Sequence, residues 1–130
     1  MKVFVDTSYY LASMARYDRC YQKTLQPIHP EIRLVTSSMV LNETVSLLQA
    51  RGILATALHF LEATRSNPAI QIVYVDPGLL AVAWSLFHTW GGLGATVVDC
   101  TSFAIMRRLG IRKAFTFDQR FRTAGFEILE

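Results

Sequence analysis

The 130-residue sequence has few charged side chains, little cysteine and no long apolar run. Charged residues make up 18% and hydrophobic residues 52%, which excludes a disordered chain and predicts one folded domain over residues 1–130. No apolar run reaches the roughly 18 residues of a membrane span. The acid at position 6 comes too soon for a secretory signal. We therefore expect a cytoplasmic protein that does not contact a membrane.

Several catalytic and metal-binding motifs are also missing. The two cysteines, Cys20 and Cys100, have no Cys-x-x-Cys or Cys/His spacing, so we expect buried thiols and no zinc site. The sequence contains no Gly-x-x-x-x-Gly-Lys loop and no Ser/His/Asp arrangement around a nucleophile elbow. Three glycines fall within residues 90–95, but a predicted helix precedes them, whereas a phosphate loop follows a strand.

Positive charge is in mild excess and unevenly placed. The net charge is +3, and six of the 13 basic residues fall within the last 24 positions, namely Arg107, Arg108, Arg112, Lys113, Arg120 and Arg122. Such a cluster is compatible with nucleic-acid binding, but it is equally compatible with a solvated surface on terminal helices. The cluster alone does not assign a partner.

Short apolar runs alternate with segments of helical period along the whole chain. The runs predict strands at 2–5, 33–36, 70–75, 113–117 and 126–129. Helices are predicted at 7–15, 19–26, 38–51, 53–65, from 77, and at 96–109, with a helical turn at 119–123. Strands that alternate with helices predict an α/β fold with a mostly parallel sheet of about five strands, covered by helices on both faces.

Four of the ten acidic residues fall at related positions of this predicted fold. Asp6 and Asp118 follow the first and fourth strands directly, at their carboxyl ends. Glu43 and Asp99 fall in the first turns of helices that begin near the same edge. Ligands of open parallel sheets bind outside the carboxyl ends of the strands. The four carboxylates are therefore expected to lie together.

Each acid also has a purely structural interpretation. Asp6 and Asp118 could cap the helices that follow them, and Thr96 with Asp99 fits a capping box. Glu43 is harder to explain in this way, because its neighbours one helical turn away are apolar. A carboxylate on an apolar stripe needs a cation, which is either a metal ion or a buried Arg or Lys.

A cluster of carboxylates has a definite chemical use. Mg²⁺ and Mn²⁺ prefer carboxylate oxygens and retained waters as ligands. Such ions neutralise a self-repelling acidic cluster, supply a hydroxide near neutral pH and stabilise the charge that develops on a phosphodiester. His29, His59 and His88 are not placed to act as the general base instead.

The residues around the four acids resemble the four motifs of PIN-domain ribonucleases. The matching segments occur in order over the whole chain: VFVDTS at 3–8, SSMVLNE at 37–43, VDCTSFAIM at 98–106 and FTFDQRF at 115–121, followed by AGF at 124–126. The resemblance implies a three-layer α/β/α sandwich and a metal-dependent ribonuclease that uses Mg²⁺ or Mn²⁺. Only the glycine-rich segment 90–95 departs from the family pattern, in which a shorter polar segment precedes the third acid.

The resemblance also implies roles for individual residues. The metal ligands and catalytic groups would be Asp6, Asp99, Asp118 and Glu43, with Glu43 holding a water or ligating directly. Thr7 and Thr116 would orient these carboxylates by hydrogen bonds.

Chains of this size in the family resemble the toxins of VapBC-type toxin–antitoxin pairs. This resemblance implies a homodimer held inactive by a cognate antitoxin, with RNA as the substrate. Leu54, Leu58 and Leu61 are expected at such a protein interface. Three alternatives stay open: an RNA-processing nuclease outside any toxin pair, a non-catalytic RNA-binding module of the same fold, and a phosphohydrolase of another α/β type. The last usually carries Asp-x-Asp after its first strand, whereas Thr7 and Ser8 follow Asp6 here.

Overall fold

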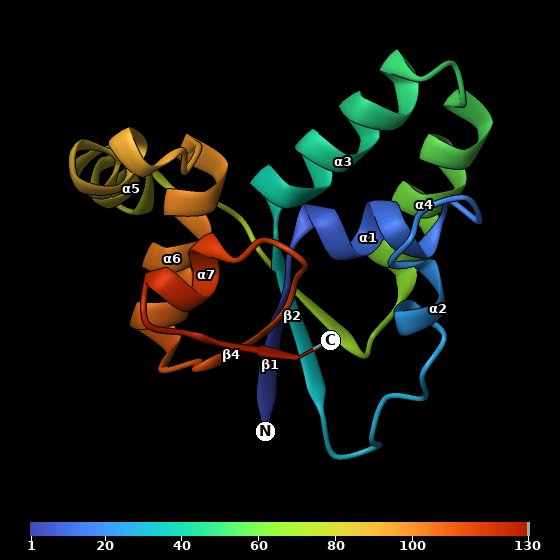
Figure 1. The fold of residues 1–130 in the computed structure, drawn as a ribbon, viewed down its shortest axis with the longest axis horizontal. Helices are drawn as coiled ribbons and strands as arrows, with labels where there is room; N and C mark the ends of the chain where they lie inside the picture. The colour runs from blue at the N-terminus through green and yellow to red at the C-terminus, as the bar shows by residue number, and fades with distance from the viewer. Residues whose placement is uncertain (130) are drawn as a thin grey trace.

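A computed structural model describes residues 1–129 and shows a five-stranded sheet with helices on both sides (Figure 1). The strands are β1 (Lys2–Val5), β2 (Arg33–Ser37), β3 (Ile70–Val73), β4 (Lys113–Phe115) and β5 (Glu127–Leu129). All neighbouring strands pair in parallel, in the order β3-β2-β1-β4-β5. The predicted α/β class and strand number are confirmed, and the sheet is wholly parallel.

Helices fill every connection between the strands. They are α1 (Thr7–Ser13), α2 (Tyr21–Thr24), α3 (Ser38–Ala50), α4 (Leu54–Ser66), α5 (Pro77–Trp90), α6 (Val97–Leu109) and α7 (Arg120–Thr123), with a 3₁₀ turn, η1 (Gly91–Leu93). In Figure 1, α1, α2 and α4 lie on one side of the sheet and α5, α6 and α7 on the other. Right-handed crossovers require this division, because the chain winds from β1 towards β3 and then returns past β1 to β4.

The predicted helix ends are set by local capping. Ser37 is the N-cap of α3, where its hydroxyl accepts from the Val40 amide at 3.1 Å, and Asp76 caps α5 with Pro77 in the first turn. At the other end of α6, Gly110 has a φ of 67°, a left-handed conformation that favours glycine. The main differences from the prediction are shorter elements, such as α2 and β4, whose last predicted residues lie in turns.

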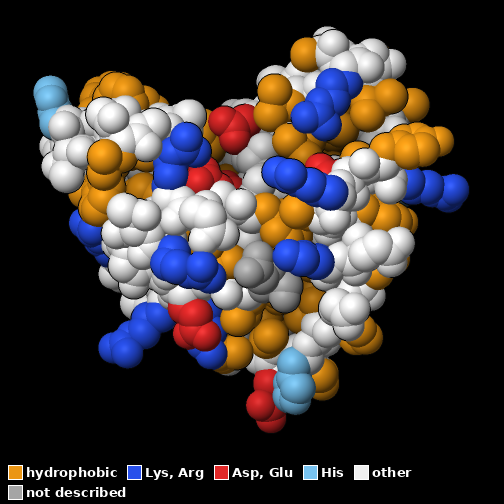
Figure 2. All heavy atoms as spheres, in the orientation of Figure 1, with side chains coloured by type: hydrophobic (Ala, Val, Ile, Leu, Met, Phe, Trp, Pro, Cys, Tyr) orange, Lys and Arg blue, Asp and Glu red, His pale blue; other side chains and the backbone are white. Residues whose placement is uncertain are grey.

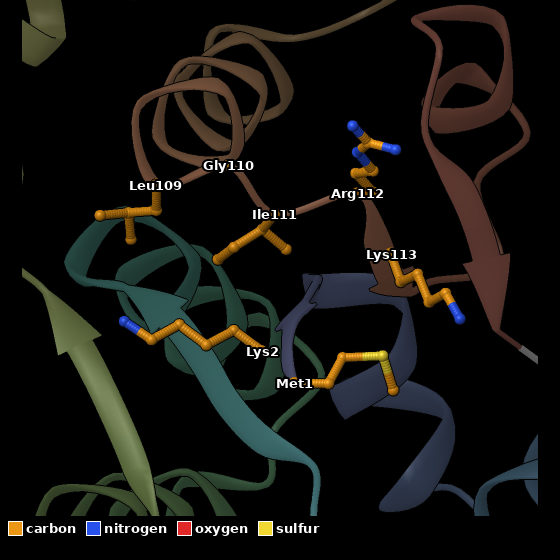
Figure 3. Close-up of a pocket in the computed structure, with 7 residues that line it drawn as sticks. All are labelled: Met1, Lys2, Leu109, Gly110, Ile111, Arg112 and Lys113. Atoms are coloured by element: carbon orange, nitrogen blue, oxygen red, sulfur yellow. The ribbon is translucent and has the colours of Figure 1, made fainter.

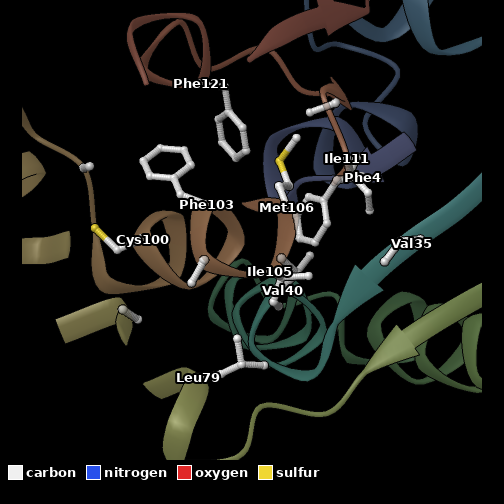
Figure 4. Packing of buried hydrophobic residues seen from close by; sticks show 14 of the residues in the cluster. Phe4, Val35, Val40, Leu79, Cys100, Phe103, Ile105, Met106, Ile111 and Phe121 are labelled. Carbon is white, nitrogen blue, oxygen red and sulfur yellow. The ribbon is translucent and has the colours of Figure 1, made fainter. Parts of the chain in front are cut away.

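The main hydrophobic core lies between the sheet and α5–α6. Phe4 of β1, Val35 of β2 and Ala114 of β4 are fully buried there. Phe103 of α6 packs edge-on against Phe121 of α7, with ring centroids 5.0 Å apart (Figure 4). This packing fixes α6 and α7 against the sheet, so the residues at their N-terminal ends are held in place beside the strand ends.

No helix among the described residues is both long enough and apolar enough to span a membrane.

Candidate active site

The four predicted acids line one cavity of about 210 Å³ at the carboxyl edge of the sheet. We call this space the acidic cavity; its lining residues are Asp6, Thr7, Ser8, Leu11, Glu43, Thr96, Asp99, Asp118 and Arg120. Asp6 follows β1 and Asp118 follows β4. These two strands are adjacent where the winding of the chain reverses, and such switch points form the ligand sites of doubly wound sheets. Figure 2 shows acidic side chains in a hollow with Lys and Arg side chains around it.

A larger cavity lies elsewhere and does not compete with this assignment. Its volume is about 380 Å³, and it opens at the other end of the strands, between Lys2 and the segment 109–113 (Figure 3). No acidic side chain lines it. Of these two cavities, only the acidic cavity therefore offers carboxylate ligands for a metal ion.

Asp6 is buried and held by hydroxyl groups from the first turn of α1 and from the end of β4. Its Oδ2 atom accepts hydrogen bonds of 2.8 Å from the Ser8 Oγ and 2.8 Å from the Thr116 Oγ1. The Thr116 Oγ1 also accepts from the Asp118 amide at 3.0 Å. One hydroxyl thus connects the backbone that carries Asp118 to the carboxylate of Asp6, and the predicted orienting role of Thr116 agrees with this geometry.

Thr7 hydrogen-bonds to the Asp6 carboxylate through its backbone, which lowers the pKa of Asp6, and not through its side chain. Its hydroxyl is buried and has no hydrogen-bond partner among the described residues. The neighbouring Ser8 donates to Asp6 instead and also accepts from the Phe117 amide at 3.0 Å. Ser8 was missed because Thr7 and Ser8 both carry hydroxyls. Which of the two faces Asp6 depends on the exact direction of the chain between β1 and α1, which the sequence does not give.

Asp99 serves a structural role within the same cavity. The Thr96 Oγ1 accepts from the Asp99 amide at 3.1 Å, and the Asp99 Oδ2 accepts from the Thr96 amide at 2.8 Å. The predicted capping box is therefore present, and it fixes the direction of this carboxylate at the start of α6. The structural and the functional interpretation of Asp99 are compatible, because the side chain still lines the cavity.

Glu43 has no hydrogen-bond or ion-pair partner within the described part of the chain, although it lines the acidic cavity and is only partly exposed. A buried Arg or Lys partner, the alternative to a metal ion, is therefore absent from the described residues. This leaves Glu43 as a carboxylate without a compensating contact of its own.

Burial and mutual repulsion shape the electrostatics of the site. Burial raises the pKa of Asp6 to about 6, against the lowering effect of the Thr116 and Ser8 hydrogen bonds, and the charge of Asp99 raises it further. Burial also raises the pKa of Asp99, the hydrogen bonds at Thr96 lower it, and the charges of Asp118 and Glu43 raise it. The four acids thus repel one another, as expected for a site that gains stability from a cation.

Asp118 differs from the other acids because a cation of the chain already contacts it. The Arg120 Nη1 lies 3.3 Å from Oδ1 and 3.2 Å from Oδ2 of Asp118, and the Arg120 amide donates to Oδ1 at 2.9 Å. The Nε of the same guanidinium donates to the Leu93 carbonyl at 3.2 Å. Sequence reasoning counted Arg120 only within the basic cluster, and nothing in its spacing indicates that it returns to the acid two residues before it.

The glycine-rich segment has a role in this contact. Gly94 has a φ of 90°, and a Cβ atom built there would lie 2.7 Å from the Arg120 Nη2. Any side chain at this position would displace the guanidinium. The segment 90–95 therefore contacts the guanidinium of Arg120 and holds it next to the acidic cavity.

The acidic cavity is not a preformed cage for a bare ion. Among residues 1–129, no three Asp, Glu, His or Cys side chains come close enough to hold one metal ion directly. The cavity nevertheless fits a hydrated ion, since its four carboxylates and the Thr7 hydroxyl offer oxygen atoms and Mg²⁺ keeps several of its waters.

Comparison with known proteins agrees with the motifs. The PIN domain model matches residues 3–127. The 23S rRNA-specific endonuclease VapC20 of Mycobacterium tuberculosis is 34% identical over 130 residues, covering 95% of each chain. The crystal structure of that protein, described as a sarcin-ricin loop cleaving toxin, superposes with a TM-score of 0.85 over 95% of both chains.

More distant structures share the fold. VapBC-1 from nontypeable Haemophilus influenzae matches with a TM-score of 0.68 at 13% identity, covering 100% of this chain and 98% of that one. FitAcB from Neisseria gonorrhoeae matches with a TM-score of 0.68 at 16% identity, covering 100% and 97%. The match of the PIN domain model to residues 3–127 and the 34% identity to VapC20 show that the chain belongs to the PIN-domain family.

Proposed function

We propose that the chain is a ribonuclease whose acidic cavity binds divalent cations and cleaves RNA phosphodiester bonds. The observation that carries the proposal is the meeting of four motif carboxylates in one cavity at the switch point of the sheet. The 34% identity to a 23S rRNA-specific endonuclease over 95% of both chains supports the same reaction.

The cation is proposed to be Mg²⁺ or Mn²⁺, because every side-chain donor in the cavity is an oxygen apart from the guanidinium of Arg120. When bound, such an ion activates water and stabilises charge on the phosphodiester. Asp6, Asp99 and Glu43 would hold the hydrated ion. Asp118 would join them when its contact with Arg120 opens. Ser8 and Thr116 keep Asp6 in a fixed direction through the two hydrogen bonds to its Oδ2.

The proposed substrate is the sarcin-ricin loop of 23S rRNA, on the strength of the similarity to VapC20. We further propose a cytoplasmic toxin formed by a single domain over residues 1–130, neutralised by an antitoxin. VapBC complexes among the structural matches support this view of the fold, and the family match covers residues 3–127. The alternative is an RNA-processing role outside a toxin pair. Binding of this chain by the product of a neighbouring gene would favour the toxin, and failure to bind would favour the RNA-processing role.

Apolar side chains on the surface are consistent with protein partners. Leu54 and Leu58 on α4 are 52% and 55% exposed, while Leu61 is half-buried. Trp84 and Phe87 on α5 are 55% and 43% exposed. We propose that the chain forms a homodimer and that light scattering of the purified protein gives twice the monomer mass. A strict monomer that binds no neighbouring gene product would contradict both partner proposals.

A pair of matched variants tests the cleavage site. Asp76 also follows a strand and precedes a helix, but it caps α5 through a 2.8 Å hydrogen bond from the Leu79 amide and does not line the acidic cavity. Asp99→Asn should lower the rate of 23S rRNA cleavage in isolated ribosomes by at least about 100-fold, or roughly 2.7 kcal/mol of barrier. Asp76→Asn should keep the rate, because Asn caps almost as well as Asp.

The two variants also show whether the acids have been assigned correctly. Folding of both is checked by thermal unfolding, and 23S rRNA ends are mapped after brief incubation. An inactive Asp76 variant beside an active Asp99 variant would place the reaction elsewhere in the molecule.

A further inference from the structure

A second, more enclosed cavity shares a wall with the acidic cavity. Its volume is about 220 Å³, and we call it the Trp90 cavity; it is lined by Trp90, Leu93, Ala95, Phe103, Arg120 and Thr123. Arg120 is the residue common to both cavities. An occupant of the Trp90 cavity therefore lies one side chain away from the carboxylates.

The shape and lining of the Trp90 cavity indicate the size and character of its occupant. Its volume exceeds the roughly 30 Å³ of one water but falls below the roughly 300 Å³ at which pockets for drug-sized ligands begin. The rings of Trp90 and Phe103 meet edge to face in its wall, with centroids 6.3 Å apart. The lining is mostly carbon, and its polar side-chain groups are the guanidinium of Arg120, the hydroxyl of Thr123 and the indole N–H of Trp90. This is the lining expected for one flat ring system with a polar edge.

The free hydrogen-bonding groups of Arg120 favour a ring with acceptor atoms. Nη1 contacts Asp118 and Nε donates to Leu93, but Nη2 donates to no described residue. The side chain is 47% exposed, so its free N–H groups are accessible. A hydrocarbon side chain from a protein would leave these donors without partners, whereas nucleobases carry ring nitrogen and carbonyl acceptors at their edges.

We propose that the Trp90 cavity binds the base of the nucleotide next to the phosphodiester that is cleaved. The proposal rests on the ribonuclease function proposed above, because the acidic cavity is where the phosphodiester would lie. RNA loops allow a base to leave its stack and insert between aromatic side chains. Arg120 lines both subsites, and its Nη2 is the group that has no described partner and is left to bind the base.

The two tryptophans of the chain make a direct binding test possible. Trp90 lines the cavity. Trp84 lies six residues earlier on α5, is 55% exposed and lines neither cavity. The indole N–H signals of the ¹⁵N-labelled protein are followed while AMP, GMP, CMP or UMP is added in EDTA. At least one nucleotide should move the Trp90 signal and leave the Trp84 signal in place. Ribose 5-phosphate, which lacks a base, should not move Trp90.

Variants in the lining connect the signal to the cavity. Ala95→Leu fills the space without touching an acid and should weaken nucleotide binding by at least about tenfold, or 1.4 kcal/mol. Ala95 is only 4% exposed, so a larger side chain there could disturb the fold. The second variant is therefore Leu93→Ser, because Leu93 is 61% exposed and its replacement removes one wall of the cavity. Leu109→Ala, in the lining of the distant cavity at the other strand ends, is the control that should bind nucleotides normally.

Three results would overturn the proposal. One is a Trp90 signal that does not move with any of the four nucleotides up to about 10 mM. This concentration is ten times a dissociation constant of about 1 mM, which corresponds to a binding free energy of about 4.1 kcal/mol. Another is an equal response to ribose 5-phosphate. The third is a Trp90 signal that responds to N-acetyl-leucinamide but to no nucleotide, which would assign the cavity to a protein side chain. Because the titration needs no catalysis, an active Asp99→Asn variant would refute the cleavage site and leave the nucleotide result to be judged separately.

Discussion

Replacing Asp6 with Asn should stabilise the protein at neutral pH in the absence of divalent cations. The Asp6 side chain is only 3% exposed, and burial is the largest cause of its raised pKa. Ionisation therefore costs more in the folded state than in the unfolded state. Asn removes this cost and keeps an oxygen that can accept the hydrogen bonds of Ser8 and Thr116.

The pH range of the effect follows from the two pKa values of Asp6. The pKa rises from the usual 3.8 to about 6 on folding. Between these values the folded protein holds a proton that the unfolded chain has released, so the stability of the wild type falls as the pH rises through this window. Below about pH 3.8 this carboxyl does not oppose folding, and above about pH 6 its full cost applies.

The magnitude comes from the same two values. The difference between 3.8 and about 6 corresponds to about 3 kcal/mol. At about 2 kcal/mol per molar urea, this would move the unfolding midpoint by roughly 1.5 M. Other groups titrate in the same range, so the useful quantity is the difference between wild type and Asp6→Asn at each pH.

The assay is urea unfolding of both proteins in EDTA at steps from pH 4 to pH 8. The midpoints should nearly coincide at pH 4 and separate up to pH 7, with the variant more stable. Thr116→Val in the Asp6→Asn background checks that the hydrogen-bond network survives in the variant. Equal midpoints at pH 7.5, or a variant that is less stable there, would show that burial of Asp6 does not carry the cost argued here.

Further perturbations test other parts of the site. EDTA should abolish RNA cleavage, and Mg²⁺ at about 100 times its dissociation constant should raise the free energy of unfolding by about 2.7 kcal/mol; unchanged activity in chelator would contradict a metal-dependent site. Ser8→Ala removes the 2.8 Å hydrogen bond to Asp6 and should cost about 1 kcal/mol of stability while raising the pKa of Asp6, which carboxyl NMR would detect. Gly94→Ala should destabilise by about 1–2 kcal/mol, because it strains a left-handed residue and displaces Arg120; Gly92→Ala, where a Cβ atom meets nothing within 4 Å and φ is not positive, is its control.

The fold was predictable because its signals are local and repeated. The order of the elements follows from the short apolar strands, the Pro77 and Gly110 boundaries and the alternation of strands with helices. The right-handed crossover rule then determines on which face of the sheet each connection packs. The strand order could not be derived from the chain alone, since it depends on which buried faces fit together. The element ends shifted where a turn uses residues that also suit a strand, as at Thr116 and Phe117.

The sequence indicated the four acids and two of their hydrogen-bond partners, Thr96 and Thr116, but not Ser8 or Arg120. The positions of Asp6, Glu43, Asp99 and Asp118 follow from strand ends and helix starts, which the sequence marks clearly. The hydrogen bond of Ser8 to Asp6 and the contact of Arg120 with Asp118 depend on side-chain directions that residue spacing does not predict. The Trp90 cavity is lined by residues from α5, η1, α6 and α7, so no pattern along the sequence predicts it.

The capping box of Asp99 has a consequence for judging activity in related sequences. Because this acid closes the first turn of α6 through the Thr96 amide, a descendant that has lost nuclease activity still gains stability by keeping it. Glu43 has no such contact among the described residues, and it lies on a largely apolar helix. Without selection for cleavage, Glu43 would be free to drift to an apolar residue. The presence of a glutamate at this position is therefore a better marker of a working nuclease than the presence of an aspartate at the position of Asp99.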